Sequence, residues 1–209
     1  METFRYGNED AQLVLIQAVD AHDLAVIENE VSEIRRLTSA DFQLIAVKTE
    51  RWNHDLSPWK SPAVFGREPF GDGAEETLTE ILRLTSGLHK TFLIGGYSLS
   101  GLFALWAAYQ TGVFSGTAAA SPSVWFPGFT EYMNTHEIRS KSVYLSLGRK
   151  EPDTRNPVMA AVGDRIRETY TILQSQGVSC ILEWNQGNHF RDTDIRTAKA
   201  FAWLINHLK

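Results

Sequence analysis

A serine in a glycine-rich turn is the residue best suited to chemistry in this sequence. Ser98 follows the apolar run Thr91–Gly95 and precedes the small and apolar segment Leu102–Ala108. That order predicts a strand, a tight turn and a helix, which is the context of a nucleophile elbow. The positions two residues before and after the serine must be small, and Gly96 and Ser100 meet that need. Ser98 is therefore the predicted nucleophile.

The same turn supplies a candidate donor for a developing negative charge. It places the backbone amide of Leu99 at the N-terminus of the predicted helix, where amide groups have no partner within the helix and the dipole favours an anion. We expect this amide to form one half of an oxyanion hole.

A serine hydroxyl needs a base to accept its proton, and one of the six histidines stands in a suitable place. His189 lies in a short loop between the apolar run Val178–Trp184 and the last helical segment, which begins near Thr193. A loop at the carboxyl end of a late strand is where a parallel sheet brings a base to the nucleophile. We predict that His189 is the base.

An acid should follow a strand between the nucleophile and the base, because the chain order in this type of site is nucleophile, acid, base. The apolar run Val143–Leu147 is followed by two carboxylates, Glu151 and Asp153. Either one can orient a histidine and stabilise its charged form. The position alone leaves both open.

The elements that must position these residues alternate along the chain. Apolar runs that predict strands are Gln12–Val19, Phe42–Val47, Phe92–Gly95, Gly116–Ala120, Val143–Leu147 and Val178–Trp184. Helical patterns lie between them, at residues 24–37, 77–84, 157–176 and 193–208. Alternating strands and helices predict an α/β fold with a mainly parallel sheet and helices on both faces. The length of 209 residues suits a single domain over residues 1–209.

The composition limits the classes of binding partner that we expect. The net charge of -5 and a pI near 5.7 provide no basic field for phosphate, so nucleic acid is not expected as a partner. No apolar stretch approaches the roughly 20 residues of a membrane span, and the N-terminus lacks the pattern of a secretory signal. We expect a cytoplasmic protein with no membrane partner. Oligomeric state is left open.

The sequence resembles a known family, the esterase branch of the α/β-hydrolases. That branch contains S-formylglutathione hydrolases, siderophore trilactone esterases, feruloyl esterases and mycolyltransferases. The resemblance runs from about Ala11 onward. It rests on Gly96–Leu105, Phe114–Gly116, Ala120–Trp125, Tyr144–Glu151 and Gly187–Phe190, with Asp55–Pro58 upstream.

The resemblance implies an α/β-hydrolase fold without a separate lid domain, and a triad of Ser98, Glu151 and His189. Its pattern of a glycine three residues before the acid favours Glu151 over Asp153. Two positions depart from the family, since Ser100 replaces a glycine and the usual His-Gly after the early strand is absent. The second oxyanion donor would then be the amide of Val19 or Asp20.

The resemblance also bears on chain length. The sequence is short for this fold, and we expect no room for additional N-terminal strands.

Tryptophans are candidates for contact with a substrate. Trp52, Trp59 and Trp125 fall in segments expected near the carboxyl ends of strands, where long aromatic loops form binding walls or cover the sheet. The nearby run Asn53-His54-Asp55 lacks further ligands at metal spacing. We expect neither a metal nor a cofactor.

These expectations lead to a serine esterase that acts on a small-molecule ester through an acyl-enzyme. Two alternatives remain at this stage. The same triad suits an acyltransferase, and the departures at Ser100 and at the missing His-Gly suit a non-catalytic binding protein with the same fold. A dehydrogenase is disfavoured because no dinucleotide-binding glycine motif is present.

Overall fold

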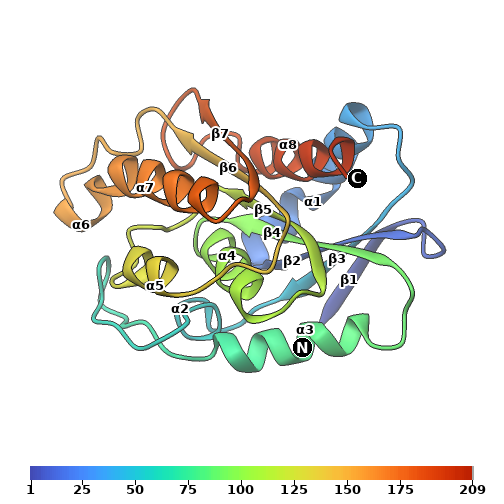
Figure 1. Cartoon of the computed structure of the whole chain (residues 1–209), viewed down its shortest axis with the longest axis horizontal. Coiled ribbons are helices and arrows are strands. Elements are labelled where there is room, and N and C mark those ends of the chain that lie inside the picture. The colour runs from blue at the N-terminus through green and yellow to red at the C-terminus, as the bar shows by residue number, and fades with distance from the viewer. Residues whose placement is uncertain (209) are drawn as a thin grey trace.

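A twisted sheet of seven strands forms the centre of the molecule in a computed structural model that describes residues 1–208. Its spatial order is β1-β3-β2-β4-β5-β6-β7 (Figure 1). The strands are β1 (Thr3–Gly7), β2 (Leu13–Val19), β3 (Gln43–Lys48), β4 (Thr91–Tyr97), β5 (Phe114–Ala120), β6 (Ser142–Gly148) and β7 (Ser179–Asn185). All neighbouring strands are parallel except the pair β1 and β3, so the predicted mainly parallel α/β architecture is confirmed.

Helices cover both faces of this sheet (Figure 1). They are α1 (Ala21–Leu37), α2 (Trp52–Asp55), α3 (Ala74–Thr85), α4 (Leu99–Gln110), α5 (Phe129–Thr135), α6 (Pro157–Ala160), α7 (Val162–Ser175) and α8 (Thr193–Asn206). Side chains of α1 and α8 share one apolar core, and those of α3, α4, α5 and α7 share the other. None of the helices in residues 1–208 combines the length and apolarity needed to cross a membrane.

Strand β2 shows why the sheet is covered on both sides. All seven of its residues are buried. Val14, Ile16 and Ala18 point into the core under α3 and α4, whereas Leu13, Leu15 and Val19 point into the core under α1 and α8. Side chains alternate between the faces of a strand, so a continuous apolar run fits a strand that helices cover on both faces.

Two features differ from the sequence expectations. An additional N-terminal strand does exist, because β1 pairs antiparallel with β3 at the edge of the sheet. Its residues are half-exposed and too polar to form a clear apolar run. The predicted helix over 157–176 is two helices, α6 and α7, which meet at Ala161.

The parallel direction of the strands decides where the chemistry gathers. Strands β2, β4, β5, β6 and β7 all end at the same edge of the sheet. The segments that follow them begin at Asp20, Ser98, Ser121, Arg149 and Gln186. Loops at the carboxyl ends of parallel strands form the binding crevice in folds of this type.

Candidate active site

Ser98 occupies a strained turn between β4 and α4. Its backbone has φ 58° and ψ -120°, a conformation that costs a non-glycine residue about 1–3 kcal/mol and is kept where the surroundings hold it. The Ser98 amide donates to the carbonyl of Ala120 at 3.1 Å. A Cβ added to Gly96 would lie 2.6 Å from the Cβ of Ser100, so the turn closes only with glycine there. The geometry is that of a nucleophile elbow.

Ser100 has a structural part in the same turn. Its side chain is fully buried, and its hydroxyl donates to the carbonyl of Ala18 at 2.8 Å. The residue thus joins the beginning of α4 to the end of β2. The serine that departs from the family pattern is accommodated because it finds a buried acceptor.

The structure brings Ser98, His189 and Glu151 together in one hydrogen-bonded chain. Ser98 Oγ lies 2.9 Å from His189 Nε2, and His189 Nδ1 lies 2.7 Å from Glu151 Oε2. A neutral histidine with its proton on Nδ1 donates to the carboxylate and accepts from the serine hydroxyl. Ser98 Oγ also lies 3.3 Å from the hydroxyl of Ser123.

Glu151 is the carboxylate that contacts the histidine. Asp153 was the other candidate acid in this loop. It is exposed and lines a nearby pocket. Oε1 of Glu151 accepts from the amide of Gly148 at 2.6 Å and from the hydroxyl of Ser121 at 2.8 Å. These donors satisfy the oxygen that faces away from His189 and stabilise a buried negative charge.

A buried arginine completes this network, and the sequence analysis missed it. Arg196 lies on α8 with 2% of its surface exposed, and its Nη1 is 3.1 Å from Glu151 Oε1. Its Nη2 donates to the carbonyls of Gln186 at 2.8 Å and Asn188 at 3.1 Å, in the loop that carries His189. One guanidinium therefore holds both the acid and the loop of the base.

Tyr97 links the same arginine to the histidine. Arg196 Nη1 donates to Tyr97 Oη at 2.9 Å, and Tyr97 Oη donates to the carbonyl of His189 at 2.7 Å. Burial, together with the negative charge of Glu151, raises the pKa of Tyr97 to about 12. The phenol therefore keeps its proton at neutral pH and remains a donor to the histidine backbone.

Leu99 and Asp20, two of the three candidate oxyanion donors, have different surroundings. Leu99 is the first residue of α4, where an amide has no acceptor within its own helix. Asp20 is the N-cap of α1, and its amide donates to Asp23 Oδ2 at 3.3 Å within a capping box. Both residues lie beside Ser98, but the amide of Asp20 already has an acceptor.

Two pockets flank Ser98 and share His189 and Phe190. One has a volume of about 470 Å³ and is mainly apolar. Its apolar lining consists of Phe65, Trp125, Met159, Val162 and Phe190. The other has a volume of about 190 Å³ and is lined by Asp20, His22, Asp23, Trp52, Tyr97 and Thr193 besides the shared residues.

The three tryptophans expected near a substrate have different positions. Trp125 lines the apolar pocket and Trp52 lines the smaller one. Trp59 instead packs against Phe126 and Tyr132, at ring-centre distances of 5.7 and 5.5 Å. Its indole nitrogen donates to the carbonyl of Pro127 at 2.9 Å, and Trp59 is not among the residues that line either pocket beside Ser98.

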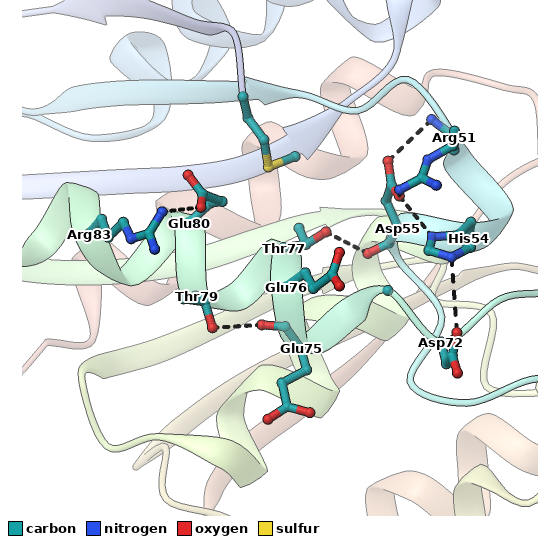
Figure 2. A pocket seen from close by; sticks show the side chains of 12 residues that line it. Arg51, His54, Asp55, Asp72, Glu75, Glu76, Thr77, Thr79, Glu80 and Arg83 are labelled. Atoms are coloured by element: carbon teal, nitrogen blue, oxygen red, sulfur yellow. Dashed lines mark hydrogen bonds and ion pairs between the residues drawn. The ribbon is translucent and has the colours of Figure 1, made fainter.

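Figure 2 shows a larger cavity, which has a volume of about 690 Å³ and does not have Ser98 in its lining. His54 lies in its wall, with Nδ1 at 3.0 Å from Asp55 and Nε2 at 3.9 Å from Asp72. Arg51 also pairs with Asp55 at 2.9 Å. Across residues 1–208, no cluster of three or more histidine, cysteine or acidic side chains is arranged to hold a metal ion. No serine or cysteine is among the described residues that line this cavity, so its one histidine, His54, has no such nucleophile beside it.

Solved structures with a similar architecture include a serine hydrolase and a siderophore hydrolase. An IroE-like serine hydrolase from Shewanella oneidensis has a TM-score of 0.73 and 14% identity, over 98% of this chain and 75% of that one. The siderophore hydrolase EstA from Aspergillus nidulans has a TM-score of 0.68 and 22% identity, over 96% and 85% of the two chains. The chain has the α/β-hydrolase fold.

Another solved structure with a similar fold is an esterase. The enterobactin esterase FES from Shigella flexneri has a TM-score of 0.63 and 14% identity, over 98% of this chain and 55% of that one. These structures match the esterase branch of the α/β-hydrolases that the sequence resembles. The sequence matches no protein-family model and no curated protein, so the likeness is one of structure.

Proposed function

We propose that this protein hydrolyses carboxylic esters with Ser98 as nucleophile, His189 as base and Glu151 as the acid that orients it. The observation that carries the proposal is the continuous chain of hydrogen bonds from Ser98 Oγ through both ring nitrogens of His189 to Glu151. The solved neighbours named as a serine hydrolase, a siderophore hydrolase and an esterase support the same chemistry.

The reaction follows from the positions of the protons. Ser98 Oγ attacks the ester carbonyl carbon while its proton passes to His189 Nε2. The tetrahedral intermediate collapses, the bond to the alcohol oxygen breaks, and the same proton passes from Nε2 to the leaving alcohol. A water molecule then attacks the acyl carbon while its proton passes to His189 Nε2. The bond to Ser98 Oγ breaks as this proton passes to Oγ, which releases the carboxylic acid and restores the serine hydroxyl.

The surroundings of the triad support each step. Glu151 holds the proton of His189 on Nδ1 and stabilises the charged imidazole that forms in the transition state. The free amide of Leu99 at the beginning of α4 is the first donor to the oxyanion. Asp20 serves as the second donor when its amide turns from Asp23 to the substrate oxygen. Trp125 and Trp52 contact the two parts of the ester.

The test is the turnover of p-nitrophenyl acetate by the wild type and by two serine variants. Ser98→Ala is expected to lose at least about a thousandfold in kcat, the usual cost of removing a triad nucleophile. Ser123→Ala is the matched variant, because its hydroxyl lies 3.3 Å from that of Ser98. Circular dichroism establishes that both variants are folded. Wild-type rates in Ser98→Ala, or their loss only in Ser123→Ala, would refute the proposal.

A further inference from the structure

The two pockets beside Ser98 differ in their chemistry, and this difference bears on the substrate. An ester has two substituents, one on the carbonyl carbon and one on the alcohol oxygen. With the carbonyl at Ser98, these substituents extend to opposite sides of the nucleophile. The inference that follows rests on the proposed function, since it assigns one substituent to each pocket.

The smaller pocket has two carboxylates in its wall and no lysine or arginine among the described residues that line it. Asp20 and Asp23 exchange backbone and side-chain hydrogen bonds at the beginning of α1. Burial and the neighbouring charge of Asp20 raise the pKa of Asp23 to about 6, so the Asp23 carboxylate is ionised at pH 8. The N-terminus of α1 contributes about half a positive charge, which offsets only part of the charge of these carboxylates.

Aromatic side chains line the same pocket as these carboxylates. Trp52, Tyr97 and Phe190 line the same pocket of about 190 Å³. The face of an aromatic ring attracts a cation, and tryptophan does so most strongly. Carboxylates and aromatic faces together form a site suited to an ammonium group. Neither feature favours an anionic substituent.

The larger pocket suits an uncharged substituent. Its volume is about 470 Å³ and its walls include Phe65, Trp125, Met159 and Val162. Lys150 and Asp153 are the charged side chains in its lining besides Glu151, which is held by its own network. Because lysine and aspartate carry opposite charges, this pocket has little net preference for either sign.

We infer that the small pocket binds a positively charged group on the alcohol part of the ester, while the large pocket binds an uncharged acyl group. The substrate class is thus an ester of an apolar carboxylic acid with an amino alcohol. Asp20 and Asp23 determine this specificity through their charge.

The experiment compares benzoylcholine with 3,3-dimethylbutyl benzoate at pH 8 and low salt. Their acyl groups are identical, and their alcohol parts have the same shape but differ by one positive charge. For the wild type we expect kcat/KM to be about tenfold higher for benzoylcholine. Raising the salt concentration to about 0.5 M should reduce this ratio, because salt screens the attraction.

Three variants test which side chains cause the difference in kcat/KM between the two substrates. Asp20→Asn and Asp23→Asn remove a charge each and keep an oxygen acceptor for the helix cap, since asparagine caps helices as well as aspartate. Each should reduce the ratio of the two kcat/KM values about threefold. Asp153→Asn removes a carboxylate from the large pocket and should leave the ratio unchanged.

A wild-type ratio near one would overturn the inference, as would equal ratios in the wild type and both helix-cap variants. Hydrolysis of p-nitrophenyl acetate without hydrolysis of benzoylcholine would also overturn it while leaving the esterase proposal standing. The proposed function itself fails on separate results, such as wild-type turnover of p-nitrophenyl acetate by Ser98→Ala or a loss of turnover only in Ser123→Ala.

Discussion

Arg196→Met tests whether one buried cation holds the proposed triad in place. The substitution keeps a long side chain and removes the guanidinium, which is 2% exposed and 3.1 Å from Glu151 Oε1. Removing one partner of a buried ion pair leaves the other charge uncompensated and costs about 3–5 kcal/mol. The carbonyls of Gln186 and Asn188 also lose a donor, but both residues are exposed and their carbonyls can bind water instead.

That cost is large enough to measure directly. In a domain of this size each kcal/mol lowers the melting temperature by about 2–4 °C, so Arg196→Met should melt roughly 6–20 °C below the wild type. Urea unfolding followed by circular dichroism gives the free energy itself. Arg36→Met is the matched control, because this arginine pairs with Glu33 on the surface with 66% of its side chain exposed. We expect little change in its stability.

The double variant Arg196→Met/Glu151→Gln separates charge from packing. It removes both charges of the buried pair, so it should be more stable than Arg196→Met alone, by about 1–3 kcal/mol. Two results would refute the reasoning. One is a loss below about 1 kcal/mol in Arg196→Met, and the other is a double variant whose loss equals the sum of the two single losses.

Two further predictions concern the buried surroundings of the site. Burial raises the pKa of Glu30 well above 4.5, although a hydrogen bond from Gln17 opposes the shift, so the folded protein holds its proton more tightly than the unfolded chain. The contribution of Glu30 to the free energy of unfolding is therefore greatest below pH 4.5. Between pH 4.5 and the pKa of Glu30 in the folded protein, this contribution falls by about 1.4 kcal/mol per pH unit. Urea unfolding from pH 5 to 8 should show a shallower decline in Glu30→Gln, and equal slopes would contradict this. Gly96→Ala should cost about 1–3 kcal/mol and most of the esterase activity, because its Cβ would lie 2.6 Å from that of Ser100. Gly112→Ala, where a Cβ meets nothing within 4 Å, is the control, and equal melting temperatures for the two variants would disprove the steric argument.

The parallel sheet, and Ser98 and His189 as candidate residues, could be predicted because their signals are local. Apolar runs such as Leu13–Val19 identify buried strands, and the small residues around Ser98 identify a tight turn. The parallel direction of the strands then places Ser98 and His189 at the edge of the sheet where the strands end. The choice between Glu151 and Asp153 needed the family resemblance, because two carboxylates in one loop have the same sequence context.

Features that depend on contacts between distant segments were missed. Arg196 is separated from Glu151 by 45 positions in the sequence. The one sequence signal that it points inward is its helical spacing with Ala200 and Leu204, which are buried on the same face of α8. The packing of Trp59 against Phe126, outside both pockets beside Ser98, could not be predicted because a sequence does not tell which side of a loop packs against the core. Strand β1 was missed because its half-exposed residues lack an apolar pattern and gain their order from β3.

The most direct measurement of the central claim is the mass of the protein after exposure to a fluorophosphonate, followed by peptide mapping. Such reagents form a covalent bond with a serine whose hydroxyl is activated by a base. The contacts of Ser98 Oγ with His189 at 2.9 Å predict a single adduct, located on Ser98 and lost in His189→Ala. An unmodified protein, or an adduct on Ser123 instead, would contradict the account.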